Sequence, residues 1–301
     1  MRRVTSIFKD DDSSGNERVH YSWLAHYFPA SQYIVYPNAA LKVIIDAEYA
    51  AVKEELHEET RWIESLQIQW LPRNFFETGS VDLCVIRKSD YLPYVAFEID
   101  GGSHFRLGRK EQDQLKTLFF AKARIPLVRL HVHRGQSERA RRRVLEESIE
   151  RLDSRLFAEP LSDTQGRKVL IADKKGREYF DLLIRTFFSH EYLVLPNVAL
   201  QSIFPSKVRL AEYIERDRHR RGLVDFSMFE TKDFRPIMAF TFSEDPVRDR
   251  VVEFFGLPLF DLRSCLDGFD GESSLCSADA VVRVQQIAME TLGCSEPTSP
   301  I

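Results

Sequence analysis

The sequence predicts a mixed α/β fold, in which a mixed sheet is flanked by helices, present as two tandem copies. The first observation is an internal repeat. Residues 20–45, HYSWLAHYFPASQYIVYPNAALKVII, run in register with residues 179–204, YFDLLIRTFFSHEYLVLPNVALQSIF. The second observation is that helical periodicity alternates with short apolar strands inside each copy. Five pieces match in the same order, which indicates a duplicated fold rather than a chance likeness.

The matched pieces predict the element order helix, strand, variable segment, strand, strand, helix, strand and helix in each copy. The first pair of pieces reads as an amphipathic helix followed by a strand. Three strand pairs follow: 79–86 with 222–229, 94–100 with 237–243, and 123–130 with 255–262. A closing helix is predicted at about 136–157 and again at about 277–292.

A segment rich in Pro, Gly, Ser and Asp predicts the boundary between the copies. Residues 159–168 are expected to form a linker, which leaves residues 1–158 as the first domain and residues 169–301 as the second.

The composition limits the possible classes of function. The 301 residues carry a net charge of −4, so a polyanion would have to bind at a local basic patch. No apolar run approaches the ~20 residues that cross a bilayer, and the charged N-terminal segment lacks the apolar core of a signal peptide. The four cysteines (Cys84, Cys265, Cys276 and Cys294) show no zinc-ligand spacing. We therefore expect a soluble cytoplasmic protein with reduced thiols.

Acidic residues gather on two predicted strands of the first copy. Asp82 lies at the start of the apolar run in GSVDLCVI, and Glu98 and Asp100 end the next strand in YVAFEID. Adjacent strands of a hairpin lie about 4.8 Å apart, so Asp82 and Glu98 can meet. Asp82 taken alone would be read as a turn residue. Together with the backbone carbonyl of Ile99, and with Asp100, the two acids predict an oxygen-rich site for Mg²⁺ or Mn²⁺.

Basic and polar groups follow this pair of strands. His104 comes after a Gly-Gly turn, and Asp113 and Lys116 lie on one face of the next helix as DQLK. Each of these taken alone has an ordinary explanation, as a loop histidine or a solvated helix residue. Their order after the acids is what indicates a catalytic site.

The order D, E-I-D-G-G-S-H, D-x-x-K and I-P-L-V-R-L resembles the PD-(D/E)XK, or restriction-endonuclease-like, superfamily. It is most similar to bacterial domains of unknown function related to very-short-patch-repair endonucleases. The likeness covers roughly residues 17–132. It implies a restriction-endonuclease-like αβββαβ core and Mg²⁺-dependent hydrolysis of DNA. It also implies that Asp82 and Glu98 bind the metal, with Glu17 as a supporting acid.

The sequence departs from that superfamily at one important position. Asp100 stands where many members have the lysine of E-x-K. Lys116, one helix later, or His104 would then have to orient the attacking water or stabilise the developing charge. The sequence does not decide between these two residues.

The second copy has lost most of the acidic set. Asp225 answers Asp82, but Thr241 answers Glu98 and Ser243 answers Asp100. A hard-cation site is not expected there. We interpret this copy as a degenerate nuclease domain retained for scaffolding, packing or substrate binding.

Two basic tracts predict contacts with nucleic acid, although either could be an ordinary exposed face. They comprise Arg139, Arg141, Arg142 and Arg143 after the first copy's last strand, and Arg216, Arg218, Arg220 and Arg221 in the second copy. The leading hypothesis is a Mg²⁺-dependent endonuclease that acts on DNA, with RNA left open. The alternative is a non-catalytic nucleic-acid-binding or adaptor subunit, which would act with protein partners in a bacterial defence or repair assembly.

Overall fold

The computed structural model places the chain in two compact units, each holding one copy of the repeat. The first-copy unit comprises residues 10–170, and the second-copy unit comprises residues 171–301 together with residues 1–9. The structure describes residues 6–8, 14–46, 76, 79–100, 109–133, 135–156, 166–187, 191–204, 222–266 and 277–292.

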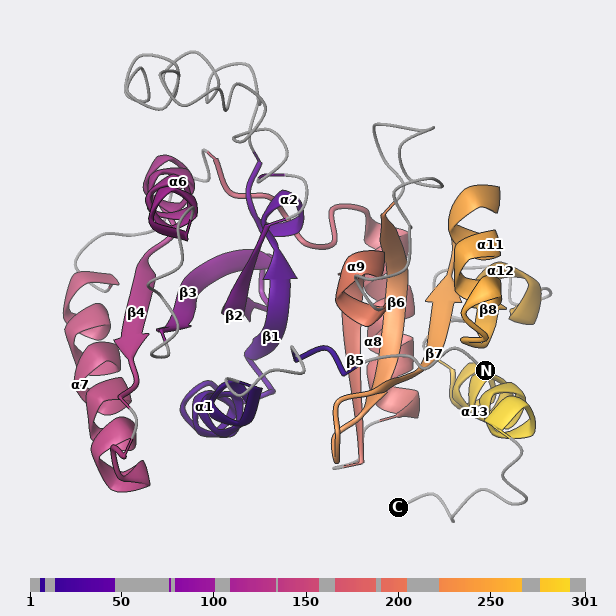
Figure 1. Cartoon of the computed structure of the whole chain (residues 1–301). Coiled ribbons are helices and arrows are strands. Elements are labelled where there is room, and N and C mark those ends of the chain that lie inside the picture. Colours follow the sequence, from indigo (N-terminus) through magenta and orange to yellow (C-terminus); the bar gives the residue numbers. More distant parts are fainter. Residues whose placement is uncertain are drawn as a thin grey trace. The chain divides into compact units, whose positions relative to one another are not determined.

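The first-copy unit is built on a four-stranded mixed sheet in the order β1-β2-β3-β4 (Figure 1). Its elements are α1 (Ser14–Tyr27), β1 (Tyr33–Ala40), α2 (Leu41–Ile44), β2 (Ser80–Arg87), β3 (Leu92–Asp100), α6 (Arg109–Lys122), β4 (Leu127–His131) and α7 (Glu138–Leu156). The first three strands are antiparallel, and β4 joins β3 in parallel through α6. Helix α1 packs on β1 and β2, whereas α6 and α7 pack on β4.

The second-copy unit repeats this arrangement with the strand order β5-β6-β7-β8. Its elements are α8 (Lys174–Thr186), β5 (Tyr192–Ala199), α9 (Leu200–Ile203), β6 (Leu223–Glu230), β7 (Pro236–Thr241), α11 (Pro246–Phe254), β8 (Leu259–Asp261), α12 (Leu262–Cys265) and α13 (Ala278–Leu292). The last strand pair is again parallel. The predicted fold class, two tandem mixed α/β domains, is confirmed.

The duplication extends to unusual backbone features. Both copies have a register shift between the second and third strands, at Val85/Ile86 and at Met228/Phe229. Each copy also has positive φ at three corresponding positions, where non-glycine residues are rarely found. These positions are Asn38 and Asn197, Tyr91 and Phe234, and Arg124 and Gly256. Because the match includes these features, the two units are copies of one fold in detail.

The core of the first-copy unit lies along its two central strands. All nine residues of β3 are buried, as are the six inner residues of β2. Near-continuous apolar sequence is typical of strands covered on both faces. Cys84 belongs to this core, where burial raises the pKa of its thiol. The charged residues that interrupt the apolar pattern of β2 and β3 are Asp82, Glu98 and Asp100, and all three are buried.

Each unit is completed by the short segment that precedes the first helix of the other copy. In the second-copy unit the Ile7 N–H donates to the Phe234 carbonyl over 3.0 Å, and the Phe8 ring packs edge-on against Phe234. In the first-copy unit the Leu170 N–H donates to the Tyr91 carbonyl over 2.8 Å. Tyr91 and Phe234 are the corresponding hairpin residues. The chain therefore passes between the units twice, at residues 9/10 and 170/171.

This exchange bears on the domain boundaries expected from the sequence. The last residues of the predicted linker pack on the first-copy unit, where the Asp46 N–H donates to the Gly166 carbonyl over 2.9 Å. The remainder of that linker, residues 159–165, lies outside the described residues.

Candidate active site

Asp82 and Glu98 meet across the β2–β3 hairpin. The register pairs Leu83 with Phe97, which places Asp82 opposite Glu98 on the neighbouring strand. The Asp82 N–H lies 3.3 Å from Glu98 Oε1, and the Ile99 N–H donates to Asp82 Oδ2 over 2.8 Å. Two buried carboxylates are thus held side by side where both strands approach their ends. Ile99, expected to contribute its carbonyl to a metal, contributes its N–H to the orientation of Asp82.

Lys116 approaches this pair from α6. Its Nζ donates to Glu98 Oε1 over 2.7 Å, and the two side chains are only 10% and 7% exposed. A buried ion pair has to offset a large desolvation cost, so it is weak evidence for a purely stabilising role. The helix after β3 therefore brings an ammonium group onto Glu98.

Asp100 lies in a second group of charges beside the first. Its Oδ1 is 3.7 Å from Arg129 on β4, and its Oδ2 is 3.4 Å from Nδ1 of the exposed His131. Arg129 also reaches Asp113 on α6, at 3.4 Å to the carboxylate and 2.9 Å to the backbone carbonyl. Arg129 thus links the end of β3 to α6, the helix that carries Lys116.

Helix α1 supplies two more buried polar residues, Glu17 and His20, one turn apart. The His20 Nδ1 lies 2.6 Å from the Asn16 carbonyl. Burial is the main cause that lowers the pKa of His20, and Arg141 lowers it further, whereas Asp82 acts in the opposite direction. Burial therefore favours the neutral form of the His20 ring, against the hydrogen bond to the Asn16 carbonyl, which acts to raise its pKa.

The oxygen ligands at this site suit Mg²⁺, which keeps several water ligands, better than a metal ion that is bound by protein side chains alone. Three buried acids, Asp82, Glu98 and Asp100, accompany one buried ammonium group, Lys116, and the partly buried Arg129. Among the side chains that the structure describes here, the acids outnumber the basic groups, and a divalent cation would offset that difference. Within the described part of the chain, no cluster of three or more His, Cys, Asp or Glu has metal-binding geometry. Mg²⁺ is commonly held by one or two carboxylates plus water and substrate phosphate, which Asp82 and Glu98 can provide.

The structure connects five of the residues expected at the site through the contacts described above: Asp82, Glu98, Asp100, Asp113 and Lys116. Glu17 is buried on α1 in the same unit. His104 lies outside the described residues, as do Arg216, Arg218, Arg220 and Arg221.

The first basic tract lies on α7, but much of its charge is already paired. Arg142 and Arg143 form ion pairs with Glu146 and Glu147 one turn later. Arg141 donates to the Asn16 side chain on α1. Arg139 is exposed. Ion pairs on an exposed helix face can still exchange for phosphate, although the tract offers less unpaired charge than its sequence indicates.

Two residues were not assigned a role from the sequence: Arg129 at the site, and the buried His20 on α1. Arg129 is the arginine of IPLVRL, and its alternation with apolar residues marks it as facing away from the core. His20 lies three residues after Glu17, the spacing that places both on one face of a helix. That spacing was the available signal for His20.

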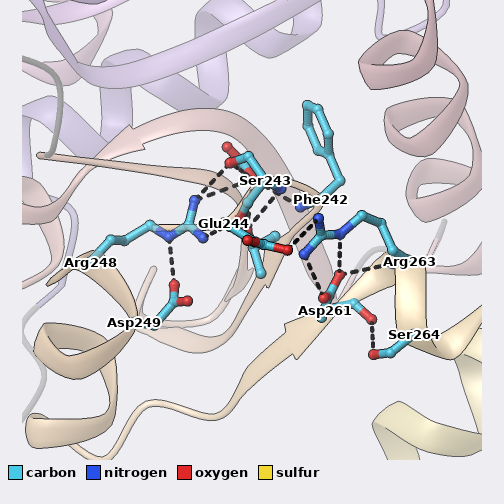
Figure 2. Close-up of polar contacts among 10 residues, drawn as sticks. Phe242, Ser243, Glu244, Arg248, Asp249, Asp261, Arg263 and Ser264 are labelled. Carbon is cyan, nitrogen blue, oxygen red and sulfur yellow. Dashed lines mark hydrogen bonds and ion pairs between the residues drawn. The ribbon is translucent and has the colours of Figure 1, made fainter. Parts of the chain in front are cut away.

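The second-copy unit holds a closed polar network at the corresponding place. Asp225 Oδ2 accepts from Thr241 Oγ1 at 2.8 Å, from Ser243 Oγ at 2.9 Å and from the Phe242 N–H at 2.9 Å. Arg248 on α11, only 2% exposed, lies 3.3 Å from the same oxygen. Figure 2 shows its guanidinium against Ser243, at 2.6 Å to the carbonyl and 3.0 Å to the hydroxyl, with Asp249 on the other side.

Arg248 corresponds to Lys116, since DPVR (245–248) answers DQLK (113–116) at the same spacing before the last strand. The sequence comparison of the two copies overlooked this match. The second copy has therefore kept one acid and the helix cation while losing Glu98 and Asp100. Beside it, Arg263 forms an ion pair with Asp261 at 2.9 Å, and hydrogen bonds from Arg263 lower the pKa of Asp261 (Figure 2).

No described helix has the length and apolarity that a membrane span requires. No curated protein and no solved structure matched the chain. The model of a family of proteins of unknown function, DUF2726, matches residues 16–149. The match runs from α1 into α7, so the first copy of the repeat, with its acidic site, is the part that is similar to this family.

Proposed function

We propose that the chain is a metal-dependent nuclease that hydrolyses phosphodiester bonds in DNA, with the reaction carried by the first-copy unit. One observation carries the proposal: the Lys116 ammonium lies 2.7 Å from Glu98, which is itself opposite Asp82 on the next strand. Two acids and a cation that converge at the ends of adjacent strands resemble the catalytic arrangement of the PD-(D/E)XK superfamily. The lysine comes from the following helix instead of the strand.

The residues divide the chemistry among them. Asp82 and Glu98 would hold Mg²⁺, which when bound supplies a Lewis acid for the phosphate and lowers the pKa of a coordinated water. Lys116, anchored on Glu98, stabilises the negative charge that develops on the phosphate oxygens. Arg129 holds Asp100 and Asp113 together and so fixes α6 against the end of the sheet.

The second-copy unit has a different role under this proposal. The guanidinium of Arg248 forms an ion pair with Asp225 and offsets its negative charge. A metal ion is therefore not needed at this position and is not attracted to it. We assign this unit to scaffolding or substrate binding. DNA as the substrate rests on the resemblance and on the exposed arginines of α7.

The test is cleavage of supercoiled and linear DNA with Mg²⁺, compared between the wild type and Glu98→Gln. Glutamine keeps the acceptor for Lys116 and for the Asp82 N–H but removes the charge. We expect cleavage to fall by about 10²–10³-fold. DNA binding, followed by fluorescence anisotropy, should remain, and EDTA should stop the wild type.

Equal cleavage by both proteins would contradict the proposal. A wild type that binds DNA but cuts none of the substrates would contradict it as well, and would favour the adaptor alternative.

A further inference from the structure

Arg129 is the side chain through which β4 contacts both the end of β3 and α6. The parallel register places it beside Glu98, so both side chains lie on the same face of the sheet. Its Nη1 is 3.7 Å from Asp100 Oδ1 and 3.4 Å from Asp113 Oδ1. The side chain is only 23% exposed. Arg129 is therefore held between two carboxylates that belong to different elements of the site.

Its hydrogen bonds to α6 fall on one turn of that helix. Nη2 of Arg129 donates to the Asp113 carbonyl over 2.9 Å and to Thr117 Oγ1 over 3.2 Å. Thr117 Oγ1 in turn donates to the Asp113 carbonyl over 2.8 Å. Lys116 lies between these two residues and donates to Glu98 from the same turn. A movement of this turn would therefore move the base of the Lys116 side chain.

Lys116 depends on such a support because of its own chemistry. A lysine carries a compact charge on a flexible four-carbon stem, so the stem alone does not fix where the charge lies. Under the proposed function the ammonium has to meet the charge that develops on the phosphate, where a displacement of about 1 Å can cost about 10²-fold in rate. Glu98 fixes one end of the side chain, and the backbone of α6 fixes the other.

The second copy has an acid in place of this arginine. Residues 257–263, LPLFDLR, answer residues 125–131, IPLVRLH, so Asp261 stands at the position of Arg129. The strand registers of the two copies agree with this match. Asp261 accepts hydrogen bonds from the backbone N–H of Arg263 over 3.0 Å and from its guanidinium over 2.9 Å. The fold therefore does not require an arginine on this strand.

The helix of the second copy is linked to the strand ends in another way. Arg248, which corresponds to Lys116, contacts Asp225 and Ser243 itself and is only 2% exposed. In that copy the basic residue of the helix is itself the structural link. In the first copy Arg129 provides a link from β4, and Lys116 lies on the glutamate of the site. The strand arginine is thus found in the copy that has the full acidic set.

Resting on the proposed nuclease function, we propose that Arg129 is a positioning residue that acts through Lys116. It holds the 113–117 turn of α6 against the end of β3 and so fixes the place of the Lys116 ammonium. Arg129 takes up no proton and binds no metal in this role. Its loss should therefore slow the chemical step and leave the affinity for DNA unchanged.

The experiment is a double-mutant cycle between Arg129→Met and Lys116→Met in the full chain, with single-turnover cleavage of DNA in Mg²⁺ as the readout. Methionine keeps an apolar stem and removes the charge. We expect Arg129→Met to cleave about 10–10²-fold more slowly at saturating DNA, with an unchanged Kd for DNA. In the Lys116→Met background the same substitution should change the rate by less than about threefold, because residues that act as a unit are not additive.

The matched control is Arg87→Met, at the opposite end of the β2–β3 hairpin. Arg87 is 28% exposed and its Nε donates to both carboxylate oxygens of Asp90, so it resembles Arg129 in burial and in pairing. It should cleave at the wild-type rate. A thermal unfolding scan shows which variants fold. If Arg129→Met does not, Arg129→Lys replaces it in the cycle, since lysine keeps the charge but not the planar fork.

A second measurement follows the Lys116 ammonium directly. Its bond to Glu98 should slow the exchange of its protons with water and give a ¹⁵N NMR signal that is absent from Lys116→Met. We expect this signal in the wild type and in Arg87→Met, and its loss or displacement in the Arg129 variant. The signal decides the question if Lys116→Met cleaves too slowly for the cycle.

The outcomes separate this inference from the proposed function. An equal loss of rate in both backgrounds, or an ammonium signal that the Arg129 variant leaves unchanged, would overturn the positioning role. The nuclease would then still stand if Glu98→Gln is inactive. If Glu98→Gln cleaves normally, the proposed function itself fails.

Discussion

The two copies place a different set of charges on the same backbone. In the first-copy unit Asp82 and Glu98 lie opposite each other with a single ammonium group, that of Lys116, on the glutamate. In the second-copy unit Asp225 is surrounded by two hydroxyls, two backbone N–H groups and a guanidinium. Among the described side chains of the first site the acids outnumber the basic groups, an excess of negative charge that a cation could offset. The second is internally neutralised, as a structural polar network should be.

The comparison separates architecture from chemistry. Asp82 accepts a hydrogen bond from the Ile99 N–H over 2.8 Å, and Asp225 accepts one from the Phe242 N–H over 2.9 Å. In each copy the donor is the residue that follows Glu98 or its counterpart Thr241. This aspartate therefore has a structural task in both copies, joining the second strand to the third. Glu98 and Asp100 have no such shared task, because Thr241 and Ser243 replace them without a change of fold. The residues lost in the second copy are thus the better guide to function.

The largest expected effect on stability comes from the closed site of the second copy. Replacing the buried Arg248 with methionine removes the ion pair with Asp225 and the bonds to Ser243. Because this leaves a carboxylate without its cation, we expect the free energy of unfolding to fall by about 3 kcal/mol. Urea unfolding followed by circular dichroism measures the change.

A matched substitution in the first copy sharpens that result. Lys116→Met also removes the cation at this helix position, but we expect Mg²⁺ to restore part of the lost stability by compensating Asp82 and Glu98. Mg²⁺ should not restore Arg248→Met. Equal rescue of both variants, or of neither, would remove the distinction between the two sites.

A smaller effect on cleavage is expected when the basic residue of each copy, Lys116 on α6 or Arg248 on α11, is replaced by the residue type of the other copy. Lys116→Arg installs the second copy's residue, whose planar fork can span neighbouring acceptors as Arg248 spans Asp225 and Ser243. We expect about 10²-fold slower cleavage at saturating DNA, because the guanidinium competes with the cation for Glu98.

The control for this exchange is Arg248→Lys, measured in the same cleavage assay. It should leave cleavage at the wild-type rate, since the second-copy site takes no part in the reaction. A large loss in this control, with a normal rate in Lys116→Arg, would reverse the assignment of the active copy.

Much of the fold could be predicted from the sequence because the repeat supplied each element twice. The pairing of β2 with β3, and with it the meeting of Asp82 with Glu98, followed from a short hairpin between two apolar runs. The sequence could not predict that Ile7 bonds to the second-copy unit and Leu170 to the first-copy unit, each just before the first helix of the other copy. A few apolar residues before a helix carry no periodicity that would indicate where they pack. The pairing of Arg129 with Asp100 and Asp113 depends on the parallel return of β4, which brings residues distant in sequence together.

The site was predicted less completely than the fold. Lys116 was expected to reach back to the acids, and its Nζ lies 2.7 Å from Glu98 Oε1, while its catalytic role stays a prediction. The burial of His20 could not be predicted, because a single histidine on an amphipathic helix resembles an ordinary surface residue until the packing is known. The match of Arg248 to Lys116 was overlooked because the copies differ in length between the third strand and the next helix.

The most direct test of the central claim is binding of Mn²⁺, as a substitute for Mg²⁺, to Asp82→Asn and Asp225→Asn by calorimetry. Both substitutions keep an acceptor for the backbone N–H of Ile99 or Phe242, so both proteins should fold. We expect the Asp82 variant to lose the Mn²⁺ bound by the wild type and the Asp225 variant to retain it. Equal binding by both variants, or loss in the Asp225 variant alone, would contradict a single metal-dependent site in the first copy.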